Sequence, residues 1–159
     1  GLKVLSPGEA DCIAIAGMGA STIISILEDD TEVAQSAELL VLQPMAGAAS
    51  LRAWLCSHGW QLAAEELVDD APHFYEIIAA KRGLAPVYSA AECAVGPLLL
   101  AQKHPLLGKQ LERQLATCRQ LLENMGRSER ARASEKYKEI EALKAELEVL
   151  QNGKRSDSK

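Results

Sequence analysis

The residues from Asp11 to Leu27, DCIAIAGMGASTIISIL, constrain the fold of this chain more than any other stretch. Cys12–Ile15 is an apolar run too short for a helix, and its β-branched side chains favour a strand. The next residues, Ala16–Ala20, contain two glycines and predict a tight turn. Apolar residues then recur at helical spacing after Ser21. The stretch therefore predicts a buried strand, a glycine turn and a helix.

The glycine turn is also a candidate ligand site. In open α/β sheets, ligands bind beyond the carboxyl ends of the strands. Gly17 and Gly19 have no Cβ, so their backbone can approach a ligand closely. A single GxG pattern is just as typical of a plain turn, and the motif alone leaves both interpretations open. A nicotinamide-binding GxGxxG motif is excluded, because Thr22 stands where the third glycine is needed.

The following segments continue an α/β pattern. A second buried strand is expected over residues 38–43, stopped by Pro44 because proline cannot donate to a sheet ladder. A helix follows and should end at Gly59. Trp60–Val68 and Phe74–Lys81 are strand-like and close enough in sequence for an antiparallel hairpin. The order predicts the C-terminal half of an α/β sheet with an antiparallel last strand.

Helical spacing dominates the chain from about residue 90. Two sets of apolar residues recur in steps of three and four: Leu111, Leu115, Cys118, Leu122 and Met125, then Ile140, Leu143, Leu147 and Leu150. The short connection between them, with Ser128 as N-cap, predicts an antiparallel, coiled-coil-like hairpin. We therefore expect an α/β unit over residues 1–88, a helical hairpin over 89–152 and a disordered polar tail over 153–159.

Composition narrows the class of protein. Apolar residues make up 48% of the chain, which excludes a disordered protein, and no apolar run reaches the length of a membrane span. The cysteines lie far apart with no CxxC, and the three histidines show no ligand spacing. We therefore expect no metal site, no disulfide framework and a reduced, cytoplasmic setting.

The charge is distributed unevenly along the chain. Residues 1–100 hold 4 Lys and Arg against 13 Asp and Glu, a net charge of −9. Residues 101–159 hold 13 Lys and Arg against 9 Asp and Glu, a net charge of +4. An anionic partner would therefore meet the C-terminal part. On charge alone, a solvated helical surface is the commoner explanation.

Five segments, in their order and spacing, resemble the TrmK-type bacterial tRNA (adenine-N1)-methyltransferases: DCIAIAGMGA, LLVLQPM, LRAWLCSHGW, FYEIIAAKRG and VGPLLLAQKHPLL. The resemblance runs from about Gly1 to Leu150. It implies the C-terminal half of a class I, Rossmann-like methyltransferase sheet followed by a helical hairpin. The activity implied is methyl transfer from S-adenosylmethionine to N1 of an adenine in tRNA, at position 22 in this family.

The resemblance also implies that part of the enzyme lies upstream. The family's glycine-rich cofactor loop and its ribose-binding acid have no counterpart in these residues, and Gly1-Leu2 resembles the tail of the family's GDGL stretch. We therefore expect an N-terminally truncated fragment that is inactive by itself, although its parent protein is an enzyme.

Candidate site residues follow from the same resemblance. The family's post-strand loop, beside the methionine end of the cofactor and the target base, corresponds to Ala16, Gly17, Met18 and Gly19. The substrate rim corresponds to Gln43 and Pro44. Two positions depart from the family pattern, Ala20 for the usual Gly and Met45 for a frequent Asn. No catalytic side chain stands out, because direct displacement at a sulfonium methyl depends mainly on orientation and electrostatics.

Binding of tRNA is expected at the basic residues near the hairpin: Lys103, Lys109, Arg113, Arg127, Arg130 and Arg132. Trp54 and Tyr75 could stack on a base, but their spacing is more typical of core residues. The alternative from another class is a non-enzymatic α/β interaction module whose coiled-coil hairpin binds a protein. The apolar stripes favour that alternative, and an acidic-Gly-x-x-x-Gly loop in the upstream coding sequence would decide for the methyltransferase.

Overall fold

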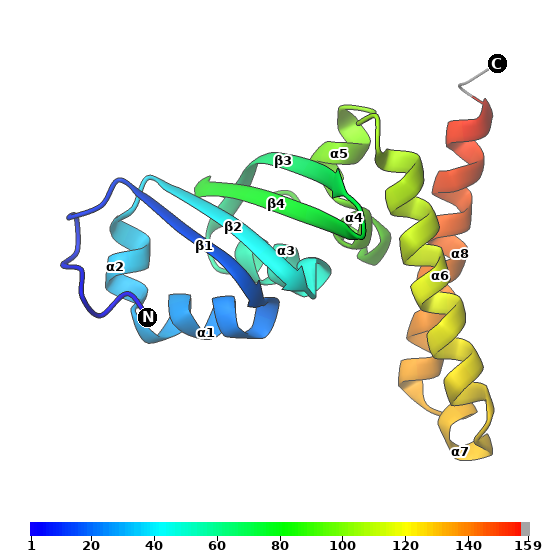
Figure 1. The fold of residues 1–159 in the computed structure, drawn as a ribbon. Coiled ribbons are helices and arrows are strands. Elements are labelled where there is room, and N and C mark those ends of the chain that lie inside the picture. Colours follow the sequence, from blue (N-terminus) through cyan, green and yellow to red (C-terminus); the bar gives the residue numbers. More distant parts are fainter. Residues whose placement is uncertain (157–159) are drawn as a thin grey trace.

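The computed structural model describes residues 1–156 and consists of an α/β lobe with a helical hairpin beside it (Figure 1). The lobe contains β1 (Cys12–Gly19), α1 (Ala20–Asp29), α2 (Thr31–Ser36), β2 (Leu39–Ala46), α3 (Ala48–Ser57), β3 (Trp60–Asp70) and β4 (His73–Arg82). The helical part contains α4 (Ala90–Val95), α5 (Pro97–Ala101), α6 (Leu107–Gly126), α7 (Glu129–Arg132) and α8 (Glu135–Ser156).

The four strands form one sheet in the order β1-β2-β4-β3. β1 and β2 are parallel, and β4 is antiparallel to both of its neighbours, β2 and β3. The predicted α/β class and the antiparallel last strand are therefore confirmed. The carboxyl ends of β1, β2 and β3 all point toward the helical hairpin (Figure 1).

Helices cover one face of the sheet. Alternate strand residues on this face are buried against α1 and α3: Ile13, Ile15, Leu40, Leu42, Ile78 and Ala80. Ile23 of α1 and Leu51 and Leu55 of α3 are fully buried in the same cluster. Full burial of each such side chain contributes about 1.5–3 kcal/mol to the free energy of folding. The apolar runs therefore determine which segments become the buried strands and helices of the lobe.

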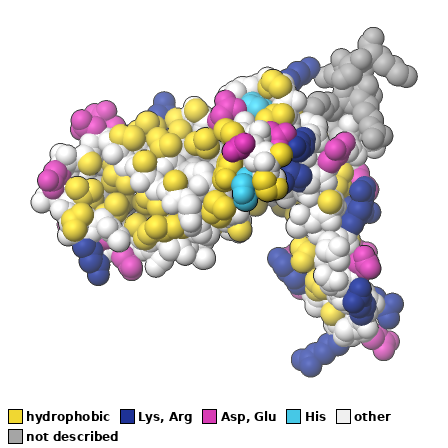
Figure 2. Space-filling view, viewed as in Figure 1, with side chains coloured by type: hydrophobic (Ala, Val, Ile, Leu, Met, Phe, Trp, Pro, Cys, Tyr) yellow, Lys and Arg dark blue, Asp and Glu magenta, His cyan; other side chains and the backbone are white. Residues whose placement is uncertain are grey.

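The opposite face of the sheet is apolar but open within residues 1–156. Cys12, Ala14 and Ala16 of β1 are exposed, and Val41 and Ile77 on the neighbouring strands are only half-buried. Figure 2 shows hydrophobic side chains gathered over the lobe on this side. The outer edge of β1 also has no strand partner in the described sheet.

Two boundaries differ from the sequence prediction. The glycines expected in a turn belong to the end of β1, where register shifts between Ala16 and Met18 and between Met18 and Gly19 accommodate them. Pro44 does not stop β2, which runs to Ala46. β4 pairs with β2 only as far as Leu42, so the missing N–H of Pro44 interrupts no ladder on that side.

The predicted antiparallel hairpin is formed by α6 and α8 (Figure 1). Leu111, Leu115 and Cys118 of α6 are buried in one cluster with Ile140 and Leu147 of α8. The two apolar stripes therefore face each other. This internal packing accounts for their spacing without a further protein.

The connection between the two helices is longer than predicted. The Ser128 hydroxyl accepts a hydrogen bond from the Ala131 N–H and so begins the separate helix α7. The Ser134 hydroxyl accepts from the Tyr137 N–H at the start of α8. Because the chain offers two serine caps in succession, the turn contains an extra helical step.

The expected disordered tail is wrong over residues 153–156, because α8 continues to Ser156. Residues 157–159 of that predicted tail lie outside the described residues. The boundary at residues 88 and 89 between an α/β unit and a helical unit stays a prediction.

Candidate functional site

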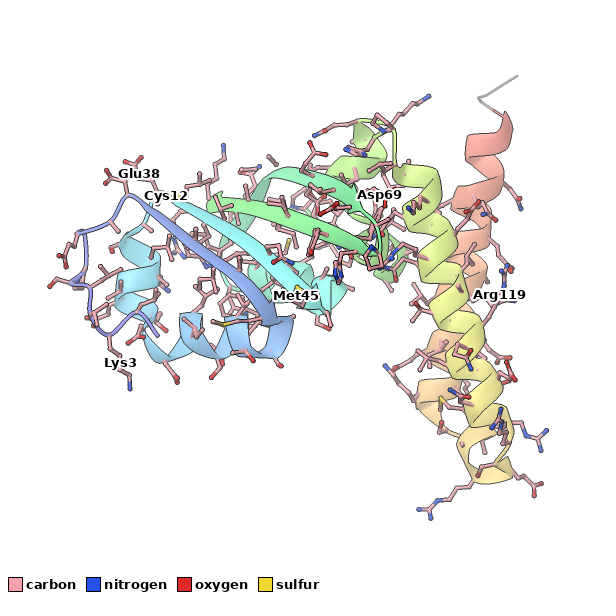
Figure 3. All side chains as sticks on the ribbon, in the orientation of Figure 1. Lys3, Cys12, Glu38, Met45, Asp69 and Arg119 are labelled. Carbon is pink, nitrogen blue, oxygen red and sulfur yellow. The ribbon has the colours of Figure 1, made fainter. Side chains whose placement is uncertain are left out.

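The ends of β1 and β2 lie side by side and form a rim at the carboxyl edge of the sheet. Ala16 pairs with Gln43, and Met18 pairs with Pro44. Met45 lies at this end of the sheet in Figure 3, whereas Cys12 and Glu38 lie at the other end. The structure therefore brings the two predicted motifs, AGMG and QP, together.

A hydrogen bond joins the two motifs directly. The Gly17 N–H donates to Gln43 Oε1 at 2.9 Å. Gln43 Nε2 lies 3.5 Å from the Met45 sulfur, a weak acceptor. One end of the Gln43 amide is therefore held by the β1 backbone, while its two N–H donors lie at the exposed rim.

Gly17 is required by backbone conformation and not by crowding. Its φ is +76°, in the left-handed region that side chains rarely adopt, and a Cβ there would meet nothing within 4 Å. The space beside Gly17 is consequently open. The rim thus offers a ligand exposed backbone with free space next to it.

Gly47, which sequence reasoning missed, lies between β2 and α3 beside Ala20 of α1. It precedes α3 with φ +79°, and a Cβ built on it would lie 3.0 Å from the Ala20 Cβ. Because Gly47 has no side chain, the Ala20 methyl group has room beside it. Its signal in the sequence is a glycine immediately after the second strand, before helical spacing begins.

Two methionines at the rim are unusually exposed. Met18 is 41% exposed and Met45 is 55% exposed. Flexible, polarisable thioethers on a surface are typical of binding sites. The sequence identified Met18 as part of a motif, but its exposure and the contact of Met45 with Gln43 depend on the strand pairing.

The two aromatic candidates have different surroundings. Trp54 lies on α3, where its ring stacks on His58 at 4.4 Å and its N–H donates to Glu28. Tyr75 lies on β4, half-buried, with its ring 5.8 Å from that of His73. The contacts of Trp54 are thus with α1 and the end of α3, and Trp54 does not belong to the rim.

The predicted RNA-binding residues divide into two groups. Lys109 forms an ion pair with Asp69, and both Lys109 and Arg113 lie over the Phe74 ring, at 5.6 Å and 4.5 Å. These contacts join α6 to the β3–β4 hairpin, beside which Asp69 appears in Figure 3. Lys103, at the end of α5, has a left-handed φ of +50°. These three residues therefore lie at the base of the helical hairpin.

The second group lies at the far tip of the helical hairpin. Arg127 makes an exposed pair with Glu123 at 3.6 Å, and Arg130 and Arg132 are exposed on α7. At about 1.5 Å per residue along α6, Arg127 lies about 21 Å from Arg113 and about 27 Å from Lys109. A phosphate chain would have to reach the tip to contact these three arginines.

Burial suppresses the reactivity of two cysteines. Burial raises the pKa of the Cys93 thiol despite the nearby guanidinium of Arg52. Burial likewise raises the pKa of Cys118, within the α6–α8 packing. Neither thiol has the electropositive, accessible surroundings of a nucleophile.

The described part of the chain contains neither a metal-ligand cluster nor a membrane-spanning helix. There, no three His, Cys, Asp or Glu side chains gather as a metal site would require. No helix within residues 1–156 is long and apolar enough to cross a membrane.

The strand order, the antiparallel last pair and the rim after β1 and β2 are those of the C-terminal part of a class I, Rossmann-like methyltransferase fold. Residues 1–152 match the family model TrmK, described as tRNA (adenine(22)-N(1))-methyltransferase, and the chain belongs to this family.

Relatives of known sequence and structure agree with this assignment. The tRNA (adenine(22)-N(1))-methyltransferase of Bacillus subtilis (strain 168) is 30% identical over 155 residues, which cover 94% of this chain and 64% of that protein. The crystal structure of the B. subtilis M1A22 tRNA methyltransferase TrmK matches with a TM-score of 0.80 at 28% identity, covering 95% of this chain and 67% of that one. Streptococcus pneumoniae Sp1610 in complex with S-adenosyl-L-methionine matches with a TM-score of 0.76 at 26% identity, covering 95% and 65%.

Proposed function

We propose that the whole protein transfers a methyl group from S-adenosyl-L-methionine to N1 of the adenine at position 22 of tRNA, in the cytoplasm. The observation that carries this proposal is the rim, where AGMG and QP meet through the bond from the Gly17 N–H to Gln43 Oε1. Membership of the TrmK family supports the choice of substrate.

The residues at the rim fit the methionine end of the cofactor. Gly17 leaves open space beside an exposed backbone, and Met18 offers an exposed apolar side chain. When bound, S-adenosyl-L-methionine supplies an electrophilic methyl group on a sulfonium. Ala16–Gly19 would hold its methionine end.

Other cofactor contacts would come from outside this chain. The chain spans 64% of the length of the curated relative that it matches. The open apolar face of the sheet and the free edge of β1 are consistent with additional packing there. We infer that the chain alone is inactive and that the missing contacts belong to another part of the whole protein.

The chemistry asks little of side chains in this chain. Adenine N1 carries a lone pair, which forms the new N–C bond while the S–C bond breaks, and the positive charge passes to the adenine ring. No proton has to leave in that step, so no general base is needed. Gln43 and the rim methionines would orient the base and exclude water, which is the main contribution that such a displacement requires.

The tip of the helical hairpin would bind the tRNA phosphates. The first 100 residues carry a net charge of −9 and repel a polyanion. Arg127, Arg130 and Arg132 are exposed at the tip and can form charge-assisted contacts with phosphate. Lys109 and Arg113 would instead hold the base of the hairpin through Asp69 and Phe74.

The test compares two tRNA transcripts that differ at one nucleotide. The whole protein is incubated with radiolabelled S-adenosyl-L-methionine and tRNA carrying either adenine or guanine at position 22. Label should enter only the adenine transcript. Equal incorporation into both, or none into either, contradicts the proposal.

A further inference from the structure

Arg52 is a fully buried cation that joins three other elements of the fold. From α3, its Nε donates to Glu65 Oε1 of β3 at 2.5 Å, and its Nη2 donates to Glu76 Oε2 of β4 at 2.8 Å. Its Nη1 donates to the Cys93 carbonyl of α4 at 2.9 Å. Its side chain is 0% exposed. Each nitrogen of the guanidinium therefore has its own partner, on a different element.

Glu65 extends this network to a further helix. It is buried, and its second carboxylate oxygen accepts a hydrogen bond from the Leu98 N–H of α5 at 2.8 Å. Burial alone would lower the pKa of Arg52, but the carboxylates of Glu65 and Glu76 raise it above its ordinary value. The arginine consequently stays charged, and the network connects α3, β3, β4, α4 and α5.

The backbone beside Arg52 leaves no spare room. Gly96, between α4 and α5, has a φ of +110°. A Cβ on Gly96 would lie 3.1 Å from Arg52 Nη2 and 2.5 Å from the Leu99 Cδ1. The guanidinium and the α4–α5 corner are therefore packed against each other closely enough to fix their relative position.

This network lies where the rim meets the helical hairpin. α3 begins two residues after β2, which carries Gln43, while α4 and α5 precede α6, with residues 102–106 between α5 and α6. Contacts elsewhere at this joint, such as Lys109 with Asp69, are partly exposed. Buried ion pairs add little net stability compared with apolar packing, but a forked guanidinium imposes direction.

We propose that Arg52 is a positioning residue, whose guanidinium fixes the angle between the helical hairpin and the rim and so places the target adenine at the methyl group. This proposal rests on the proposed function for its consequence in catalysis. Its structural half, the fixed angle, does not depend on that function.

The angle is measured first, in this chain. Spin labels are placed at Glu38→Cys, just before β2, and at Glu139→Cys on α8, both exposed, with Cys12 and Cys56 replaced by Ser. Arg52→Lys keeps the charge but cannot make three directed bonds. The label-to-label distance distribution should shift or broaden in Arg52→Lys. It should stay unchanged in the control Leu55→Val, which disturbs the same helix on its side facing the sheet core.

Kinetics in the whole protein test the consequence. A misplacement of about 1 Å can cost on the order of 100-fold in rate. Arg52→Lys should therefore lower kcat by about 10-fold to 100-fold. Because the tip arginines are intact, the Kd for tRNA should change by less than twofold, and the slope of its salt dependence should be unchanged. Leu55→Val should retain the parental kcat at a temperature where both variants are folded.

The results of these two experiments distinguish a failure of this proposal from a failure of the proposed function. An unchanged distance distribution in Arg52→Lys, or a kcat no lower than that of Leu55→Val, overturns the proposal. If Arg52→Lys does not fold, Glu76→Gln weakens the bond to Arg52 Nη2 without removing the guanidinium and is scored by the same criteria. A parent that methylates no tRNA refutes the proposed function, and the distance measurement then still decides whether Arg52 fixes the angle.

Discussion

Two glycines with the same backbone conformation allow the effect of backbone strain to be measured separately from the effect on function. Gly17 has φ +76° and Gly8 has φ +82°, and a Cβ would meet nothing within 4 Å at either position. Both N–H groups donate to a side chain, Gly17 to Gln43 and Gly8 to Ser36. Gly17 lies at the rim, whereas Gly8 precedes β1 at the other end of the sheet. Gly8→Ala is therefore a matched control for Gly17→Ala.

The cost in stability should be the same for both variants. Forcing alanine into the left-handed region costs about 1–2 kcal/mol. For a domain of this size, each kcal/mol lowers Tm by about 2–4 °C. Thermal unfolding should therefore show similar, modest decreases in Tm for Gly8→Ala and Gly17→Ala.

The effect on activity should differ between the two. In the whole protein, the added methyl group at residue 17 enters the space proposed for the methionine end of the cofactor. Gly17→Ala should lower cofactor affinity, measured by calorimetry, and the methylation rate by at least about tenfold, which corresponds to about 1.4 kcal/mol. Gly8→Ala should leave both unchanged. Parental activity in Gly17→Ala, or equal losses in both variants, refutes a cofactor role for this end of β1.

Three further outcomes are expected. Replacing the tip arginines Arg127, Arg130 and Arg132 with Ala should weaken tRNA binding and reduce the log–log slope of its salt dependence by about 0.9 per lost contact. Replacing Lys3 and Lys81 on the lobe with Ala should leave the slope unchanged. Equal slopes in the two variants would exclude the tip as the phosphate-binding site. Thiol labelling followed by mass spectrometry should modify exposed Cys12 first and the buried Cys93 and Cys118 last, because burial raises the pKa of both thiols. Early labelling of Cys118 would mean that the hairpin opens. Calorimetry should detect no binding of S-adenosyl-L-methionine to this chain alone, and tight binding would show that its own residues suffice.

The succession of strands and helices along the chain could be predicted from its apolar runs. Ile13, Leu40 and Ile78 belong to short apolar runs, and such runs are stable only inside a sheet core. The stripes of α6 and α8 were predictable for the same reason, since their apolar residues recur at the period of the helix. The succession of strands and helices could therefore be predicted from the local spacing of apolar residues.

The details of the site depend on strand pairing, which local patterns do not contain. The register shifts around Met18 extend β1 through its glycines, and Pro44 interrupts no ladder with β4, because β4 stops pairing with β2 at Leu42. The residue types of Arg52, Glu65 and Glu76 are those of a surface, and only the fold places them in one buried network. Similarly, net charge could not show that Lys109 is committed to Asp69 while Arg130 is exposed.

The most direct test of the central claim identifies the methylated nucleoside. The whole protein is incubated with tRNA and S-adenosyl-L-methionine carrying a deuterated methyl group, and the digested tRNA is examined by liquid chromatography and mass spectrometry. The account predicts deuterium in 1-methyladenosine, at position 22. Deuterium in another nucleoside, or an unlabelled tRNA in the presence of folded protein and bound cofactor, would contradict it.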